Sequence, residues 1–270
     1  MMILTTLLRR GLVLLLAAWL AAGLSAQAAG VVAYTEESPP YHYMENGKVA
    51  GVAADLLRAA CERAKVNCSI ELLPWARAMA LTRLKPNSLV FSVVRTPERE
   101  DNFIWLSPIA TEPVWLYGRP DSPPVQSLAD LRHVRVGVIN GSSGAAFLRA
   151  AGAPPQSIDV ANSADANLRK FALRRVDFIL GTDNRMQQQL ARQPLPFKVG
   201  KALQIADATS YYAMHPQSSP DVVAALRGAL EELRVSKPYK DKLNRNEPAE
   251  RLNEPGAGCS SRCRNRAPAS

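Results

Sequence analysis

The sequence predicts an α/β protein built from two lobes with a cleft between them. Stretches that favour strands alternate with stretches that favour helices, which is typical of a mostly parallel sheet covered by helices. The alternation occurs twice, on either side of a loop at residues 119–124. Extended segments near residues 115–120 and 208–215 join the two series. The roughly 240 residues after the N-terminal segment are enough for each lobe to bury its own core.

The first series begins with a strand at residues 31–35, a run rich in β-branched side chains. Asn46-Gly47 lies between two extended segments, at 41–43 and 48–52, and predicts a hairpin turn. Asp55 stands in the first turn of a helix at 53–64, where a carboxylate interacts favourably with the helix dipole. The series continues with a strand at 69–73, a helix at 75–84, and a mostly apolar strand at 88–94 that we expect to be covered on both faces.

The second series follows two extended segments at residues 103–108 and 114–117. Its elements are a strand at 134–139, helices at 144–151 and 164–174, and strands at 176–180 and 208–214. An amphipathic helix at 220–234 comes last. Ser219 is placed to cap this helix, with Pro220 and Asp221 in its first turn and Arg234 near its end.

Residues 1–28 have the layout of a secretory signal peptide. Arg9 and Arg10 precede an uncharged run at residues 11–24, and Ala26-Gln27-Ala28 supplies a small-residue cleavage site. The alternative is a membrane anchor, but the uncharged run is shorter than the roughly 20 residues of a spanning helix. We therefore expect an exported protein. Its parts are lobe 1 (29–117), lobe 2 (118–207), a return to lobe 1 with C-terminal helices (208–250), and a disordered tail (251–270).

Charge and composition exclude two classes of protein. The formal net charge is +9, but much of the excess lies in the two terminal segments and no basic stripe is interleaved with aromatic side chains, so nucleic-acid binding is not expected. No second long apolar run occurs, which excludes a polytopic membrane protein. His42, His133 and His215 are scattered, and the spacing typical of a zinc site is not present, so no metal is expected.

The chain has 4 cysteines. Cys61 and Cys68 are expected to form a disulfide, because an exported protein meets an oxidising compartment. The alternative for this pair is two buried thiols. Cys259 and Cys263 lie in a tail of small, basic and proline residues, and we assign them no role.

Five stretches, in this order, carry a resemblance to a known family: YTEESPPYHYMENGKVAGVAADLLRAAC, LPWARAM, RTPEREDNFIWLSPI, SLADLRHVRVGVINGSSG and RRVDFILGTD. Together they resemble the family-3 extracellular solute-binding proteins, the polar amino-acid receptors of bacterial ABC importers, from about residue 30 to about residue 240. The resemblance implies the type II clamp of periplasmic binding proteins. In that fold two crossover segments join the lobes and the ligand lies between them.

The resemblance implies that Arg99 binds the carboxylate of the ligand, a task that suits the planar fork of a guanidinium. The alternative is a surface arginine paired with Glu98 or Glu100. Ser142 and Ser143 match family positions that contact the same carboxylate from lobe 2, in a glycine-rich turn that opens a helix.

Thr182 stands where the family commonly has an aspartate for the ammonium of the ligand, and Asp183 follows it. We therefore expect the site to require a carboxylate more strictly than an ammonium, because an unpaired ammonium is costly to bury. The alternative for Asp183 is a helix N-cap. The further candidates in lobe 1 are Glu36, Tyr41, Tyr43, Trp75, Ser92 and Val94. For Trp75, the helical apolar pattern that follows it favours a place in the core over a place in the pocket.

The resemblance predicts a periplasmic solute-binding protein that captures a small amino acid or carboxylate for a membrane ABC permease, as a monomer and without a cofactor. Two other functions stay open. One is an exported dehydratase-type enzyme on the same fold, for which Glu36 or His42 is the candidate acid or base. The other is a receptor module that reports its ligand to a sensor. No Gly-x-Ser-x-Gly elbow or phosphate-binding loop occurs, so we prefer a protein that is not an enzyme.

Overall fold

A computed structural model of the chain describes residues 30–246, with side chains as far as residue 242. The strands are β1 (Val31–Thr35), β2 (Tyr43–Glu45), β3 (Lys48–Ala50), β4 (Cys68–Leu72), β5 (Ser88–Val94), β6 (Ile104–Gly118), β7 (Val136–Ile139), β8 (Ile158–Ala161), β9 (Phe178–Gly181) and β10 (Gly200–Met214). The α-helices are α2 (Val52–Ala64), α3 (Trp75–Leu84), α4 (Gly144–Ala150), α5 (Ala164–Ala172), α6 (Asp183–Arg192), α7 (Pro220–Arg234) and α8 (Lys237–Asn246). Short 3₁₀ helices are η1 (Pro97–Asn102), η2 (Leu128–His133) and η3 (Pro155–Ser157).

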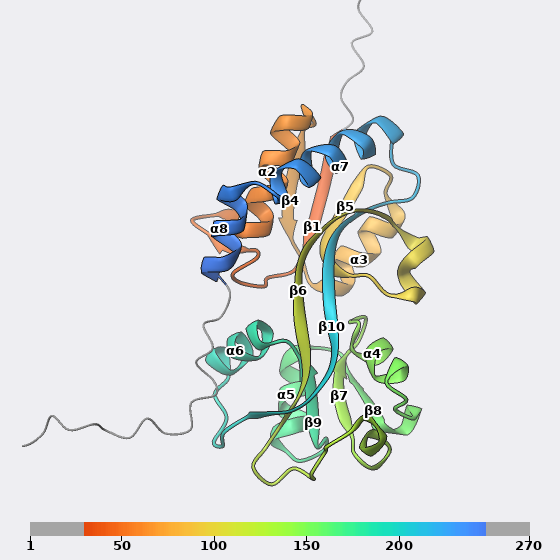
Figure 1. Cartoon of the computed structure of the whole chain (residues 1–270), viewed down its shortest axis with the longest axis vertical. Helices are drawn as coiled ribbons and strands as arrows, with labels where there is room; N and C mark the ends of the chain where they lie inside the picture. Colours follow the sequence, from red (N-terminus) through yellow and green to blue (C-terminus); the bar gives the residue numbers. More distant parts are fainter. Residues whose placement is uncertain (1–29, 247–270) are drawn as a thin grey trace, which may run out of the picture.

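The described elements form two lobes that two long strands join (Figure 1). β6 and β10 run antiparallel to each other through both lobes, and the strands of the main sheet follow the order β4-β1-β5-β10-β6-β9-β7-β8. Lobe 1 contains β1, β4 and β5 with α2, α3, α7 and α8, and lobe 2 contains β7, β8 and β9 with α4, α5 and α6. Both connections between the lobes lie inside a strand, β6 or β10, so no loop marks where one lobe ends. The lobe boundaries at 117/118 and 207/208 therefore stay a prediction.

Each lobe buries apolar side chains on both faces of its sheet. In lobe 1, Leu57 of α2 and Leu226 of α7 belong to the cluster on one face, and Met79 of α3 belongs to the cluster on the other. In lobe 2, Leu148 of α4 and Leu168 of α5 lie in separate clusters in the same way. The central strand β5 is buried along most of its length, which confirms the prediction made from its apolar run.

Most of the predicted elements occur where the sequence placed them. β1, α3, β5 and α7 have the predicted bounds. β2 and β3 pair as a hairpin around Asn46 (φ 50°) and Gly47 (φ 75°), and both residues have the left-handed backbone that such a turn requires. Cys61, near the end of α2, forms the predicted disulfide with Cys68 at the start of β4.

The structure differs from the predicted elements in several places. The strand predicted at 208–214 begins at residue 200 and runs to 214 as β10. The extended segments at 103–108 and 114–117 belong to one strand, β6, whose polar middle lies where the chain passes between the lobes. α6 and β8 were not predicted. α6 carries few apolar side chains, and β8 is a short strand that contains the polar residue Asp159. The side chain of Ser219 makes no capping bond to α7; instead its backbone N–H donates to Oδ1 of Asn87 at 2.9 Å.

Two predictions lie outside the described residues. They are the signal peptide at 1–28 and the tail at 251–270, with Cys259 and Cys263. Between residues 30 and 246, no helix combines the length and the apolar character that crossing a membrane requires.

Candidate functional site

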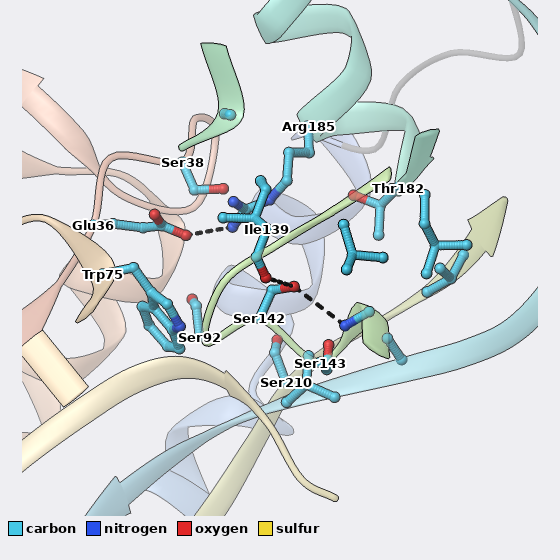
Figure 2. A pocket seen from close by; sticks show the side chains of 18 of the residues that line it. Glu36, Ser38, Trp75, Ser92, Ile139, Ser142, Ser143, Thr182, Arg185 and Ser210 are labelled. Carbon is cyan, nitrogen blue, oxygen red and sulfur yellow. Dashed lines mark hydrogen bonds and ion pairs between the residues drawn. The ribbon is translucent and has the colours of Figure 1, made fainter. Parts of the chain in front are cut away.

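A cavity of about 360 Å³ lies between the two lobes (Figure 2). Lobe 1 lines it with the loop after β1, the start of α3 and the end of β5. Lobe 2 lines it with the turn between β7 and α4, the end of β9 and the start of α6. The crossing strands β6 and β10 contribute side chains such as Glu112 and Ser210. Because the walls come from both lobes, the relative position of the lobes determines the shape of the cavity.

Arg99 is a buried cation on the wall of this cavity. It belongs to η1 and is only 8% exposed. Its Nη1 donates to the carbonyl oxygen of Val94 at 2.9 Å, and its Nη2 donates to the carbonyl oxygen of Gly141, in the other lobe, at 2.7 Å. Burial, and secondarily the nearby charge of Arg83, lower the pKa of Arg99 to about 10, so the side chain is still cationic at neutral pH.

No carboxylate among residues 30–242 forms an ion pair with Arg99. The two glutamates beside it in the chain are engaged elsewhere: Glu98 pairs with Arg149 at 3.3 Å, and Glu100 accepts from Nε of Arg95 at 2.8 Å. The alternative of a surface arginine paired with either glutamate is therefore wrong. A guanidinium removed from water without an anion is unfavourable, so this wall of the cavity suits a ligand carboxylate.

The turn between β7 and α4 brings lobe 2 against lobe 1. Gly141 has φ +72°, a left-handed conformation that favours glycine. Its carbonyl oxygen accepts from Arg99 and also from Nε1 of Trp75 at 3.1 Å. Trp75 packs against the buried cluster around Met79 and also lines the cavity, so it contributes to both the core and the pocket.

Ser142 and Ser143 line the cavity from the same turn. The hydroxyl of Ser142 is engaged within the turn, since it donates to the carbonyl oxygen of Ile139 at 2.7 Å and accepts from the N–H of Gly144 at 3.2 Å (Figure 2). Ser142 therefore stabilises the shape of the turn. Contact of either serine with a ligand stays a prediction.

Ser92 faces the cavity from β5 with a left-handed backbone, φ +60°, which is uncommon for serine. Its Oγ lies 2.7 Å from Nε2 of His42, which is 1% exposed. Nδ1 of His42 lies 2.5 Å from the carbonyl oxygen of Glu36, so Nδ1 carries the proton and Nε2 is the acceptor. Burial lowers the pKa of His42 to about 4, which keeps the ring neutral. The Ser92 hydroxyl therefore donates to His42 and presents only lone pairs to the cavity.

Two further contacts join the lobes across the cavity. Glu36, in the loop after β1, accepts from Nη2 of Arg185 on α6 at 2.5 Å (Figure 2). Attraction to Glu36 raises the pKa of Arg185. The side-chain amide of Gln188, also on α6, donates to the carbonyl oxygen of Pro39. Together with the contacts of Gly141, these bonds link the two lobes across the cavity.

β6 places an acid in the cavity that the sequence did not indicate. Glu112 is half-buried and lies opposite Ala208 of β10, which also lines the cavity. Nδ2 of Asn184 donates to Oε1 of Glu112 at 2.6 Å. Burial raises the pKa of Glu112; hydrogen bonding from Asn184 and the charge of Arg185 offset this only in part, and the negative charge of Asp183 adds to the rise.

Most of the residues predicted to bind the ligand meet at this cavity. They are Glu36, Tyr41, Trp75, Ser92, Val94, Arg99, Ser142, Ser143 and Thr182. Asp183 and Tyr43 do not line it. The carboxylate of Asp183 accepts from the hydroxyl of Tyr117 at 2.5 Å and from Lys201 at 2.7 Å. Asp183 is not the N-cap of α6 either, because Thr182 holds that position without a capping bond from its side chain.

Glu112, Arg185 and Ser210 line the cavity without having been predicted. Their only sequence signal was polar character in stretches that read as connections or loops, which is too weak to assign a role. Among the residues that the structure describes, no three histidine, cysteine, aspartate or glutamate side chains form a group suited to a metal ion.

A two-lobed α/β clamp with a cavity between the lobes defines a class of ligand-binding proteins. The family model of bacterial extracellular solute-binding proteins, family 3, matches residues 31–245, and the chain belongs to this family. The predicted fold class and the family resemblance are thereby confirmed.

Known relatives and solved structures agree with this assignment. The chain is 24% identical over 206 residues to the "Probable amino-acid-binding protein YxeM" of Bacillus subtilis (strain 168), covering 75% of this chain and 78% of the relative. It is similar to a histidine kinase sensor domain that resembles periplasmic binding proteins, with a TM-score of 0.71 at 20% identity over 82% of this chain and 97% of that one. The arginine-, lysine-, histidine-binding protein ArtJ from Geobacillus stearothermophilus gives a TM-score of 0.68 at 19% identity over 81% and 95% of the two chains. At these identities the two structures bear on the fold alone.

Proposed function

We propose that the protein captures a small amino acid or carboxylate in the cavity between its lobes and delivers it to a membrane ABC permease. The observation that carries the proposal is Arg99, a buried guanidinium on the cavity wall whose neighbouring glutamates pair with other arginines. A ligand carboxylate would supply the anion that this guanidinium lacks. Family membership and the amino-acid-binding description of the Bacillus subtilis relative support the same class of ligand.

Contacts between the lobes support a clamp in which binding and closure are coupled. Arg99 belongs to lobe 1 but donates to the carbonyl oxygen of Gly141 in lobe 2. A carboxylate held by Arg99 would therefore contact both lobes only in the closed arrangement. Contacts that exist in one arrangement alone shift the equilibrium towards it. The closed form would then dock on the permease through a surface to which both lobes contribute.

The contacts of the two acid–base candidates argue against an enzyme. Ser92 and His42 have the spacing of a nucleophile and its base, but a histidine with a pKa of about 4 is a weak base at neutral pH. Glu36, the other candidate, is ion-paired with Arg185. We therefore propose ligand binding without catalysis.

A thermal-shift screen of the mature chain against amino acids, polyamines and small carboxylates, followed by calorimetry, tests the proposal. We expect compounds that carry a carboxylate to stabilise the protein, by about 2.7 kcal/mol at a hundred times Kd, and polyamines to have no effect. The proposal would be contradicted if polyamines alone stabilised the protein, or if none of the carboxylates in the screen did.

Uptake of the identified ligand tests the role of the permease separately. Cells that lack the gene are expected to take up the labelled ligand more slowly than cells in which the gene is restored. Equal uptake in the two strains would favour a receptor that reports to a sensor over a transport protein.

A further inference from the structure

The carboxylate of Glu112 lies in the cavity with neutral hydrogen-bonding neighbours. Nδ2 of Asn184 donates to its Oε1 at 2.6 Å, and the hydroxyl of Thr182 also stabilises its charged form. Both neighbours come from the start of α6, in lobe 2. Neutral donors compensate a buried carboxylate less well than a cation does.

The basic side chains around Glu112 are paired with other acids. Arg185, which is close enough to influence Glu112, forms its ion pair with Glu36 at 2.5 Å. Lys201 is paired with Asp183 at 2.7 Å. Across residues 30–242, no lysine, arginine or histidine forms an ion pair with Glu112. The cavity therefore holds one cation without an anion, Arg99, and one anion without a cation.

The strand positions next to the two groups lie close together along β10. Val94, whose carbonyl oxygen binds Arg99, lies opposite Ser210 of β10. Ala208, two residues along β10, lies opposite Glu112 on the other side of that strand. Two residues of a strand span about 7 Å, so the backbone positions that anchor the two groups lie close together, and both side chains line the same cavity.

We propose that Glu112 binds the ammonium group of the ligand, so that the cavity selects compounds carrying both a carboxylate and a protonated amine. The inference rests on the proposed function, in which Arg99 binds the carboxylate. The sequence led to the opposite expectation because residue 182 is threonine. The acid comes instead from β6, and Thr182 adds a hydroxyl beside it. Ser92, which presents only lone pairs to the same cavity, is a second acceptor for an N–H group.

Matched ligands with and without the α-amino group test this inference. The twenty proteinogenic amino acids and their deaminated acids are first compared by thermal shift. Pairs such as L-alanine and propionate, L-glutamine and glutaramate, or L-arginine and 5-guanidinopentanoate are then titrated by calorimetry into the wild-type protein and Glu112→Gln. Glutamine has nearly the shape of glutamate and keeps an acceptor for Asn184, so the variant is expected to fold.

We expect the wild-type protein to bind the amino acid about a hundredfold more tightly than its deaminated partner. Glu112→Gln should lose most of this preference while its affinity for the deaminated acid changes less than about threefold. Asp207→Asn is the matched control, because Asp207 is an exposed acid beside Ala208 on β10 that does not line the cavity. This control should keep the wild-type preference.

The possible outcomes separate the inference from the proposed function. Equal affinity of the wild-type protein for both members of each pair would overturn the inference and leave carboxylate capture standing. An unchanged preference in Glu112→Gln would do the same, because the ammonium would then have another partner. Failure of the wild-type protein to bind any carboxylate would overturn the proposed function, and this inference with it.

Discussion

Replacing Arg99 by alanine is expected to remove most of the affinity for a carboxylate ligand while the fold persists. The substitution deletes the buried guanidinium from the cavity wall and with it two hydrogen bonds to carbonyl oxygens. The bond to Val94 lies within lobe 1, whereas the bond to Gly141 joins the two lobes. The change therefore removes a proposed ligand contact and one contact of the closed arrangement.

The magnitude follows from the burial of the side chain. Arg99 is 8% exposed, so a carboxylate bound to it forms a desolvated charge pair. Truncating one partner of such a pair costs about 2–5 kcal/mol, which corresponds to a loss of about 30-fold to 5,000-fold in Kd. Loss of the bond to Val94 costs about 1 kcal/mol of folding stability. This is small beside the roughly 5–15 kcal/mol of a typical domain.

The assay is calorimetric titration of the ligand found by thermal shift, together with thermal unfolding of each ligand-free variant. Arg99→Lys keeps the charge but not the planar fork, and we expect it to bind with intermediate affinity. Arg95→Ala is the matched control, because Arg95 is an exposed arginine four positions away that pairs with Glu100. An unchanged Kd in a cooperatively folded Arg99→Ala protein would refute the reasoning.

Three further predictions concern stability, pH and closure. Replacing Cys61 and Cys68 by alanine should lower the free energy of unfolding by about 2–3 kcal/mol, as loop entropy predicts for a short loop. Thiol titration of the unfolded wild-type protein should find this pair unreactive until it is reduced. Burial raises the pKa of Glu112 above its ordinary value. Affinity for an amine-bearing ligand should therefore fall as the pH is lowered through that raised pKa, and binding near this pKa should release a proton. A constant affinity in calorimetry between pH 4 and pH 8 would contradict the role of Glu112 in binding the ammonium. Glu36→Gln should break the half-buried pair with Arg185 and shift the ligand-free protein towards the open form by roughly fivefold, which X-ray scattering would register as a larger radius of gyration.

Local patterns were sufficient to predict most elements of both lobes. The apolar run of β5 and the amphipathic spacing of α7 are properties of neighbouring residues, so they can be read without knowing the fold. The Asn46-Gly47 turn and the Cys61–Cys68 bridge likewise join residues close in the chain. α6 escaped prediction because it is held against its lobe by few apolar side chains, among them Met186.

The candidate site could be predicted only where a residue matched a family position. Arg99 and Thr182 were found in this way, and both line the cavity. The same reasoning also named Asp183, which does not line the cavity and instead binds Tyr117 and Lys201. Proximity in the chain to a ligand position does not say which way a side chain points at the start of a helix. Glu112 matched no motif and lay in a segment taken for a connection, so nothing in the sequence marked it.

The sequence by itself determined the α/β class, the two series of strands and helices, the disulfide and the family. Only the tertiary structure decided which charges lie unpaired in the cavity and which are paired across it. Glu36 and Arg185 are separated by 149 positions in the chain, and Glu112 and Asn184 by 72. The physical reason is that periodicity reports which face of an element packs inside its own lobe. Contacts across the cleft depend instead on how β6 and β10 cross between the lobes, and that crossing leaves no local pattern.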